Sequence, residues 1–281
     1  MTFITAELGI NANGSIDIAK KLIDAAKWAG ANSVKFQKRT VDIVYDGQLD
    51  NPRESPWGTT LRDQKYGLEF SRDEYDEINR YCAAIGMPWY ASAWDIPSLE
   101  FLNEYDLPYN KIASAMLTNL PFMEAISAQS KPCFISTGLS SHEQIVTALQ
   151  IMRRGNLKYP EDNPITLMHC VGTYPAAESD LNLSSIGTLR ARYGLPVGYS
   201  GHEASVSPSV IAAALGAVSV ERHITLDRAM YGSDQAASLE PIGFKTMVEQ
   251  IRKLPIIMGD GVKRVTEGEK AVAKKLRYWE K

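Results

Sequence analysis

The chain has few cysteines and no motif that would pair them. Cys82, Cys133 and Cys170 are an odd number and show no C-x-x-C spacing. This pattern argues against a disulfide framework and against a structural zinc site. We therefore expect three buried free thiols.

Long apolar runs, a leader segment and an excess of one charge are also missing. No stretch approaches the roughly 18 apolar residues that a membrane span needs. The first residues, MTFITAELGI, lack the basic start and long apolar centre of a secretory signal. The net charge is -3 and no basic block occurs, so no field would attract a nucleic-acid backbone. We predict a cytoplasmic protein that binds neither membrane nor nucleic acid.

What the sequence does contain is a regular alternation of short β-rich runs and stretches with a helical period. Helical patterns such as IDIAKKLIDAAKWAG and DEYDEINRYCAAIG close on a glycine, as a left-handed C-cap requires. The eight predicted strands are Phe3–Leu8, Ser33–Gln37, Trp89–Ser92, Tyr109–Ala113, Cys133–Ser136, Ile165–Cys170, Val197–Ser200 and Ala217–His223.

This alternation fits either an open doubly wound sheet or a closed barrel. Eight units within 281 residues favour the α/β fold known as the (β/α)₈ TIM barrel, as one domain spanning 1–281. The interval from Arg39 to Glu69 is rich in Asp, Pro and Gly and lacks a helical period, so we expect an extended loop there. The chain ends in a charged helical stretch, EGEKAVAKKLRYWEK.

Polar residues gather where the predicted strands end, which is where such barrels place their active sites. In chain order they are Glu7, Lys35, Gln37, Ser92, Lys111, Ser114, Ser136, Thr137, His169, Ser200, His202, Glu221 and His223. Taken singly, each of these residues is as readily explained as a cap or a solvated side chain as by a functional role. Their accumulation at one rim predicts a site.

Two lysines lie inside otherwise apolar strands, in SVKFQ and YNKIAS. A buried ammonium group needs an anion. Glu7 is available to one of them, but the hydroxyls of Ser114, Ser136 and Ser200 favour a phosphate-bearing substrate as the partner. The STG turn at 136–138 adds backbone N–H groups ahead of a helix. These features predict a phosphate site.

Two histidines end adjacent strands. His202 and His223 follow the seventh and eighth strands, so their imidazoles can converge on one cation above the barrel mouth. Two histidines with few carboxylates leave coordination positions for water and substrate. His142, in SSHEQI, begins a helix and is interpreted as structural, whereas His169 is left open between the two roles.

At these residues the chain resembles the sialic acid synthase family, closest to its animal-type branch. The likeness runs from Phe3 to about Pro241. The stretches that carry it are AELGINANGS, GANSVKFQK, LPYNKIAS, ISTGLSS, VGYSGHE and ERHITLDRAMYGSDQAASLEP. The family joins phosphoenolpyruvate to N-acetylmannosamine or its 6-phosphate and forms a nine-carbon sugar acid.

The resemblance implies a role for each matching position. Glu7 would be the catalytic carboxylate, and His202 and His223 the ligands of a divalent metal, with Mn²⁺ expected and Mg²⁺ or Co²⁺ as alternatives. Gln37, Tyr174 and Asp234 would face the amino sugar. The residues implied to hold phosphoenolpyruvate are Lys35, Lys111, Ser114, Ser136 and Ser200.

The chain also departs from the family pattern. Ala12, Val171-Gly172 and Gln235 replace polar residues, and the run Ala113-Ser114-Ala115-Met116 replaces a glycine-rich run that ends in an acid. These changes reshape the sugar site, so the exact acceptor stays open. The C-terminal antifreeze-like (SAF) domain, which in the family reaches across a dimer and presents an arginine to the sugar, is expected to be absent. Three alternatives stay open for the expected homodimer: a separate polypeptide supplies that arginine, the sugar is held without it, or activity is weak.

Two other functions stay open on the same residues. The first is another phosphoenolpyruvate-dependent synthase with an eight- or seven-carbon product. The second is a catalytically inactive barrel that binds a sugar.

Overall fold

The computed structural model describes residues 1–129, 131–155 and 165–280. Within that part of the chain, eight parallel strands close a barrel in the order β1-β10-β9-β8-β7-β6-β5-β2, which confirms the predicted fold. The barrel strands are β1 (Phe3–Glu7), β2 (Ser33–Lys38), β5 (Trp89–Ala93), β6 (Asn110–Ile112), β7 (Cys133–Ser136), β8 (Ile165–His169), β9 (Val197–Gly201) and β10 (Ser219–His223). They match the predicted strands to within two residues at each end.

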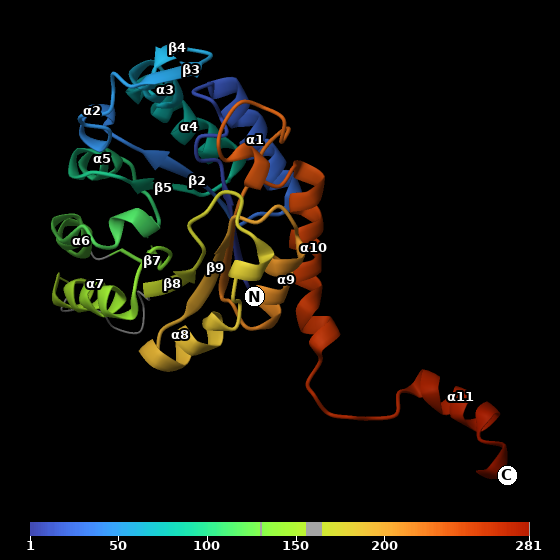
Figure 1. Cartoon of the computed structure of the whole chain (residues 1–281). Helices are drawn as coiled ribbons and strands as arrows, with labels where there is room; N and C mark the ends of the chain where they lie inside the picture. The colour runs from blue at the N-terminus through green and yellow to red at the C-terminus, as the bar shows by residue number, and fades with distance from the viewer. Residues whose placement is uncertain (130, 156–164, 281) are drawn as a thin grey trace.

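Helices surround the barrel (Figure 1). They are α1 (Ile16–Ala29), α4 (Arg72–Ile85), α5 (Ile96–Leu102), α6 (Leu120–Ser127), α7 (His142–Gly155), α8 (Ser185–Tyr193), α9 (Ser207–Ala214) and α10 (Pro241–Met258). Helix α1 illustrates the local rules, since the Ser15 side chain caps its start and Gly30 ends it with φ +89°. Its buried face, which includes Leu22, Ile23 and Ala26, packs toward the strands.

Strand alternation divides the side chains into two layers. On β2, Val34 and Phe36 face the helices, whereas Lys35 and Gln37 face the barrel interior. At the amino-terminal end of the strands, aromatic rings fill the interior, with the Phe3 and Tyr109 centroids 5.4 Å apart. The carboxyl end is left to polar and charged groups.

The expectation of an extended loop from Arg39 to Glu69 is wrong. This segment contains α2 (Val41–Val44), the hairpin strands β3 (Pro52–Ser55) and β4 (Gly58–Thr60), and α3 (Leu61–Leu68). These elements are too short to show a sequence period. One local and one long-range contact stabilise them instead: Thr60 and Asp63 form a capping box, and the Trp57 ring packs against Tyr231 from the loop after β10.

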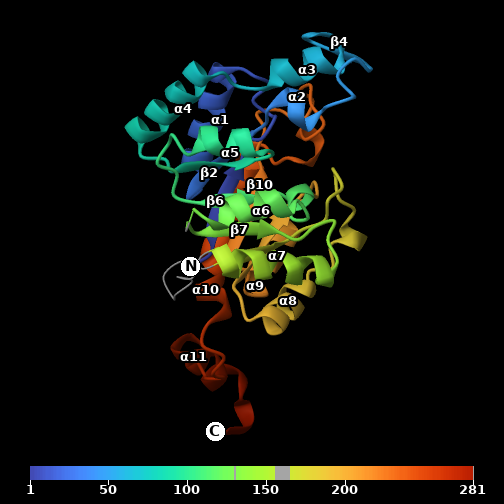
Figure 2. The ribbon, with the colours of Figure 1, turned by 90° about the vertical axis from the view of Figure 1, so that its left-hand side faces the viewer.

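The hairpin and the chain terminus lie at opposite ends of the molecule. Both views show β3 and β4 at one end and the predicted charged helix, α11 (Glu267–Leu276), beyond the other (Figure 2). Short 3₁₀ turns occur at Ser114–Met116, Glu178–Asp180, Gln235–Ala237 and Tyr278–Glu280. None of the described helices is both long and apolar enough to cross a membrane.

Candidate active site

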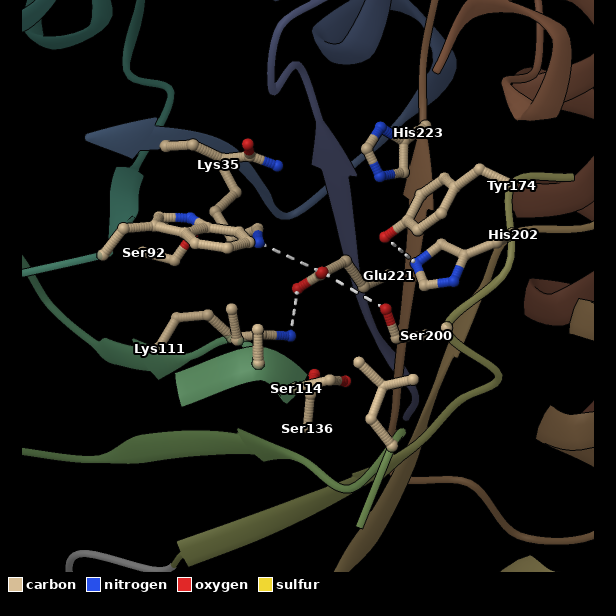
Figure 3. A pocket seen from close by; sticks show the side chains of 16 residues that line it. Lys35, Ser92, Lys111, Ser114, Ser136, Tyr174, Ser200, His202, Glu221 and His223 are labelled. Carbon is tan, nitrogen blue, oxygen red and sulfur yellow. Dashed lines mark hydrogen bonds and ion pairs between the residues drawn. The ribbon is translucent and has the colours of Figure 1, made fainter. Parts of the chain in front are cut away.

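A cavity of about 210 Å³ opens at the carboxyl ends of the barrel strands. The predicted site residues that line it are Lys35, Gln37, Lys111, Ser114, Ser136, Tyr174, Ser200, His202 and His223. The other two lie directly behind this lining. Glu7 is fully buried against Lys35 and Gln37, and an Asp234 carboxylate oxygen lies 3.8 Å from His223 Nδ1. Residues from distant parts of the sequence therefore meet at one place (Figure 3).

The two buried lysines share a carboxylate. Glu221 Oε2 lies 2.9 Å from Lys111 Nζ, and its Oε1 lies 3.2 Å from Lys35 Nζ. Lys35 also lies 3.1 Å from Glu7 Oε2, and the Ser200 hydroxyl donates to Glu221 Oε1 at 3.3 Å. Glu221, which the sequence did not identify as their partner, therefore serves as a counter-ion of both lysines within the protein, and a substrate phosphate beside them stays a prediction.

The two glutamates differ sharply in their proton affinity. Burial raises the pKa of Glu7 to about 7, since the attraction of Lys35 offsets only part of the desolvation and Glu221 adds repulsion. Burial alone would also raise the pKa of Glu221, but Lys111 and Lys35 outweigh it and hold that pKa well below its usual range. Near neutral pH, Glu221 is a fixed anion and Glu7 is able to exchange a proton.

The two imidazoles that face the cavity are neutral. Burial lowers the pKa of His202 and of His223 to about 3 each, and repulsion from neighbouring cationic groups lowers it further. Their ring centroids lie 5.7 Å apart. His202 Nδ1 lies 2.6 Å from the Val171 carbonyl oxygen, which only accepts, so Nδ1 carries the hydrogen and Nε2 presents a lone pair.

These two side chains fit a metal ion. A ligating histidine commonly donates its second N–H to a backbone carbonyl, as His202 does. His223 Nδ1 is buried and has no hydrogen-bond partner among the residues that the structure describes. In the described residues no group of three or more His, Cys, Asp or Glu side chains is preassembled for a metal, so water and substrate would complete the coordination of a cation held here.

Two further side chains, Tyr174 and Gln37, and the backbone of Gly9 enclose the imidazole side of the cavity. Tyr174 stacks on His202 with ring centroids 4.0 Å apart, and its hydroxyl lies 2.9 Å from His202 Nε2. Gln37 donates to Glu7 Oε1 at 2.8 Å. A Cβ atom at Gly9 would lie 2.9 Å from the same carboxylate oxygen, and its φ of +48° also favours glycine. The carboxylate end of Glu7 is thus tightly enclosed.

The serine side of the cavity matches the prediction only in part. Ser136 and Ser200 are buried, and the Ser114 hydroxyl contacts the Cys170 sulfur at 3.2 Å. The expectation of free N–H groups in the STG turn is wrong for Thr137, because its N–H donates to the Met168 carbonyl at 3.0 Å. The Thr137 N–H is therefore not available to a phosphate at this turn.

Several residues of the site were missed or unassigned in the sequence. Glu221 was placed at the rim without a role, although it lies two residues before His223 and so on the same strand face. Trp94 lines the cavity and was not identified, and Ser92 lines it with a buried hydroxyl that lacks a partner. No sequence signal marks Trp94, since it follows the end of β5 in an irregular turn.

The remaining two histidines make contacts outside the pair formed by His202 and His223. His142 Nδ1 bonds with the Tyr193 hydroxyl at 2.8 Å, and its structural role stays a prediction. His169 Nε2 lies 2.7 Å from the Leu181 carbonyl oxygen, which favours the structural alternative. All three cysteines are free and buried, as expected.

Comparisons with known proteins agree with this geometry. The model of the NeuB family matches residues 22–263. N-acetylneuraminate-9-phosphate synthase of Homo sapiens is 36% identical over 278 residues, covering 98% of this chain and 76% of the relative. N,N'-diacetyllegionaminic acid synthase of Campylobacter jejuni is 34% identical and covers 95% and 80%.

A solved structure supports the same relationship. An N-acetylneuraminic acid (sialic acid) synthetase from Leptospira borgpetersenii, in complex with citrate, superposes with a TM-score of 0.83 and 29% identity. The alignment covers 99% of this chain and 93% of that one. The two chains share their whole barrel.

Proposed function

Because the chain belongs to the NeuB family, we propose that it condenses phosphoenolpyruvate with an amino-sugar aldehyde to form a nine-carbon 2-keto-3-deoxy sugar acid. C3 of phosphoenolpyruvate forms a bond to the aldehyde carbon, water adds at C2, and cleavage of the C2–O bond releases inorganic phosphate. The observation that carries this proposal is the meeting of two buried lysines and two neutral imidazoles in one cavity.

The lysine side of the cavity would hold phosphoenolpyruvate. Lys35 and Lys111 present two positive charges against the single fixed charge of Glu221. The hydroxyls of Ser114, Ser136 and Ser200 would donate to carboxylate and phosphate oxygens. Because these groups lie opposite His202 and His223 (Figure 3), they would orient C3 toward the imidazole side.

The imidazole side would hold the aldehyde. His202 and His223 would bind a divalent metal ion, Mn²⁺ in our proposal, which supplies Lewis-acid polarisation of the aldehyde oxygen. Gln37, Tyr174 and Asp234 would contact the sugar. Glu7 would accept a proton from the water that adds at C2, and its pKa of about 7 suits that task.

A substrate panel tests the proposed reaction. The purified protein with Mn²⁺ and phosphoenolpyruvate is offered N-acetylmannosamine, its 6-phosphate, a dideoxy-diacetamido hexose and arabinose 5-phosphate, and released phosphate and product mass are recorded. We expect a nine-carbon product from at least one amino sugar. Turnover of arabinose 5-phosphate alone would indicate an eight-carbon synthase, and failure to bind phosphoenolpyruvate in calorimetry would indicate an inactive barrel.

Light scattering on the same sample tests the proposed homodimer.

Two cationic side chains beside the sugar side of the cavity, Arg39 and Lys65, favour a phosphorylated acceptor. Arg39 stacks 4.3 Å above Trp94, which lines the cavity. Burial lowers the pKa of Lys65, and repulsion from Arg39 and Arg53 lowers it further, with only partial compensation from Asp234 and a neighbouring glutamate. Because the described structure gives Lys65 no ion pair with a carboxylate, a sugar phosphate would be a favourable partner.

Replacing Lys65 by alanine tests that preference. We expect KM for the 6-phosphate of N-acetylmannosamine to rise about 10–150-fold, because a hydrogen bond to a charged group contributes about 1.5–3 kcal/mol. KM for the unphosphorylated sugar should not change. Lys245→Ala is the matched control, since Lys245 also lies over an aromatic ring, Trp28, but on the outer helices. Equal effects on both sugars would contradict a phosphate contact.

A further inference from the structure

A buried ion pair lies immediately behind the two cavity histidines. Arg222 Nη1 is 2.7 Å from Glu203 Oε1, and both side chains are completely buried. Glu203 follows His202 in the chain, and Arg222 precedes His223. The histidines face the cavity, whereas Arg222, one residue earlier on β10, faces outward toward α9. Each histidine is therefore covalently adjacent to one member of the pair.

The guanidinium ties the loop after β9 to β10. Arg222 donates to the Ser205 carbonyl at 2.9 Å, to the Ser209 hydroxyl at 2.9 Å and to the Glu203 carbonyl. The second oxygen of the Glu203 carboxylate accepts from the Tyr199 hydroxyl at 2.7 Å. One side chain on β10 thus holds two points of the loop that begins with His202, Glu203 and Ser205, and one point in the first turn of α9, Ser209.

The two histidines depend on this connection to different degrees. His223 ends β10 inside the sheet, where it pairs in register with Glu7 of β1. His202 lies one residue beyond the end of β9, so no strand pairing holds its backbone. The Ala176 N–H donates to the His202 carbonyl at 3.0 Å, and His202 Nδ1 donates to the Val171 carbonyl. The Tyr174 hydroxyl donates to Nε2, the atom that would bind the metal, so a metal ion would displace this bond and His202 would then depend on the other contacts and on the loop.

Stability alone gives no reason for such a pair. Replacing a buried ion pair by apolar side chains of similar volume is often neutral or stabilising, because desolvation offsets the attraction between the charges. The pair does provide directed bonds of fixed length between the loop and the strand. We propose that Glu203 and Arg222 are positioning residues that set the separation and orientation of the His202 and His223 imidazoles, and thereby the metal affinity of the site. This inference rests on the proposed metal-binding role of the two histidines.

The test compares metal affinity with stability. The double variant Glu203→Leu/Arg222→Met removes both charges and keeps apolar volume. We expect Mn²⁺ binding, measured by calorimetry without substrates, to weaken about 10–100-fold, the usual effect of losing the groups that orient a metal ligand. The melting temperature of the metal-free protein should stay near that of the wild type, and phosphoenolpyruvate binding without metal should be unchanged.

A second variant covers the case in which the double variant does not fold. Arg222→Lys keeps the charge but loses the forked contacts to Ser205 and Ser209, so we expect a smaller but measurable loss of Mn²⁺ affinity. Arg252→Met is the control, because Arg252 also donates to a backbone carbonyl, that of Thr2, but at the opposite end of the barrel. It should leave Mn²⁺ affinity unchanged.

The outcomes separate this inference from the proposed function. Wild-type Mn²⁺ affinity in folded Arg222→Lys and in the folded double variant would overturn the positioning role while leaving the metal site intact. Failure of the wild-type protein to bind Mn²⁺ would overturn the proposed metal site and this inference with it. Loss of affinity in Arg252→Met equal to that in Arg222→Lys would overturn the positioning role, because it would trace the effect to general destabilisation.

Discussion

Replacing Glu7 by glutamine is expected to lower kcat by about 10²–10⁴-fold, the range typical for loss of a positioned acid–base group. Glutamine has nearly the same shape and retains an oxygen that can accept the 2.8 Å bond from Gln37. It cannot take up a proton. The change therefore removes the proton acceptor while leaving the enclosed geometry around Gly9 in place.

The pH profile identifies the cause of that loss. The carboxyl of Glu7 has a pKa of about 7, so its ionised form increases as the pH rises through that value. We expect kcat/KM of the wild type to rise on the acidic side of its profile, and we expect that limb to be missing in Glu7→Gln. Glu7→Asp, which keeps the proton acceptor but shortens its reach, should keep the limb at a reduced rate.

Two results would contradict this role. One is a Glu7→Gln enzyme that retains near wild-type kcat, and the other is an acidic limb that persists unchanged in the variant. Binding of phosphoenolpyruvate measured by calorimetry is the control, because the serines and Lys111 that would hold it are untouched.

The barrel was predictable from sequence because its determinants are local. The pattern SVKFQK places Val34 and Phe36 on one strand face and Lys35 and Gln37 on the other, whatever the loops do. Parallel strands joined by helices then bring all carboxyl ends to one rim. For that reason, residues as far apart as Glu7 and His223 could be assigned to one site before their distance was known.

Within the site, the contacts that could not be predicted from the sequence are those that depend on which strand ends face one another. Glu221 lies 110 residues after Lys111, and only the closed barrel shows that this carboxylate reaches across the interior to both lysines. The N–H of Thr137 could not be assigned either, since its acceptor belongs to the neighbouring strand. His169 is a different case, because its partner carbonyl lies in the loop that follows its own strand, and no sequence pattern fixes how that loop folds back.

Replacing Glu221 by glutamine is expected to lower the free energy of unfolding of the substrate-free protein by about 3–5 kcal/mol, because two buried ammonium groups would lose their shared counter-ion. Lys111 has no other carboxylate partner among the described residues, and Lys35 keeps only Glu7. The pKa of Lys111 is already lowered by burial, and loss of the Glu221 charge would lower it further. Ser200→Ala is the control in the absence of substrate, because it removes only the hydrogen bond to Glu221, worth about 1 kcal/mol.

Phosphoenolpyruvate should compensate for much of the Glu221→Gln loss, since its carboxylate and phosphate restore negative charge beside the lysines. We therefore expect saturating phosphoenolpyruvate to raise the melting temperature of Glu221→Gln more than that of the wild type. Equal stability and equal ligand shifts would show that Glu221 is not the counter-ion of the lysines. A smaller shift in the variant would show instead that the lysines need Glu221 to hold their orientation.

The pH dependence of stability distinguishes the two glutamates by sign. The pKa of Glu221 in the folded protein is lowered below its ordinary value of 4.5, so its contribution is complete above that value and is lost only as the pH falls through the folded pKa. The difference in unfolding free energy between the wild type and Glu221→Gln should therefore be constant from about pH 5.5 to pH 8.

The pKa of Glu7 is raised instead, so its contribution is complete below about pH 4.5 and is lost as the pH rises through about 7. The free energy of unfolding of Glu7→Gln should accordingly increase relative to that of the wild type as the pH rises from about 5.5 to 8. Urea titrations at three pH values would separate this slope from the constant difference expected for Glu221→Gln. A constant difference for Glu7→Gln, or a sloping one for Glu221→Gln, would reverse the assignment of fixed anion and proton acceptor on which the proposed chemistry depends.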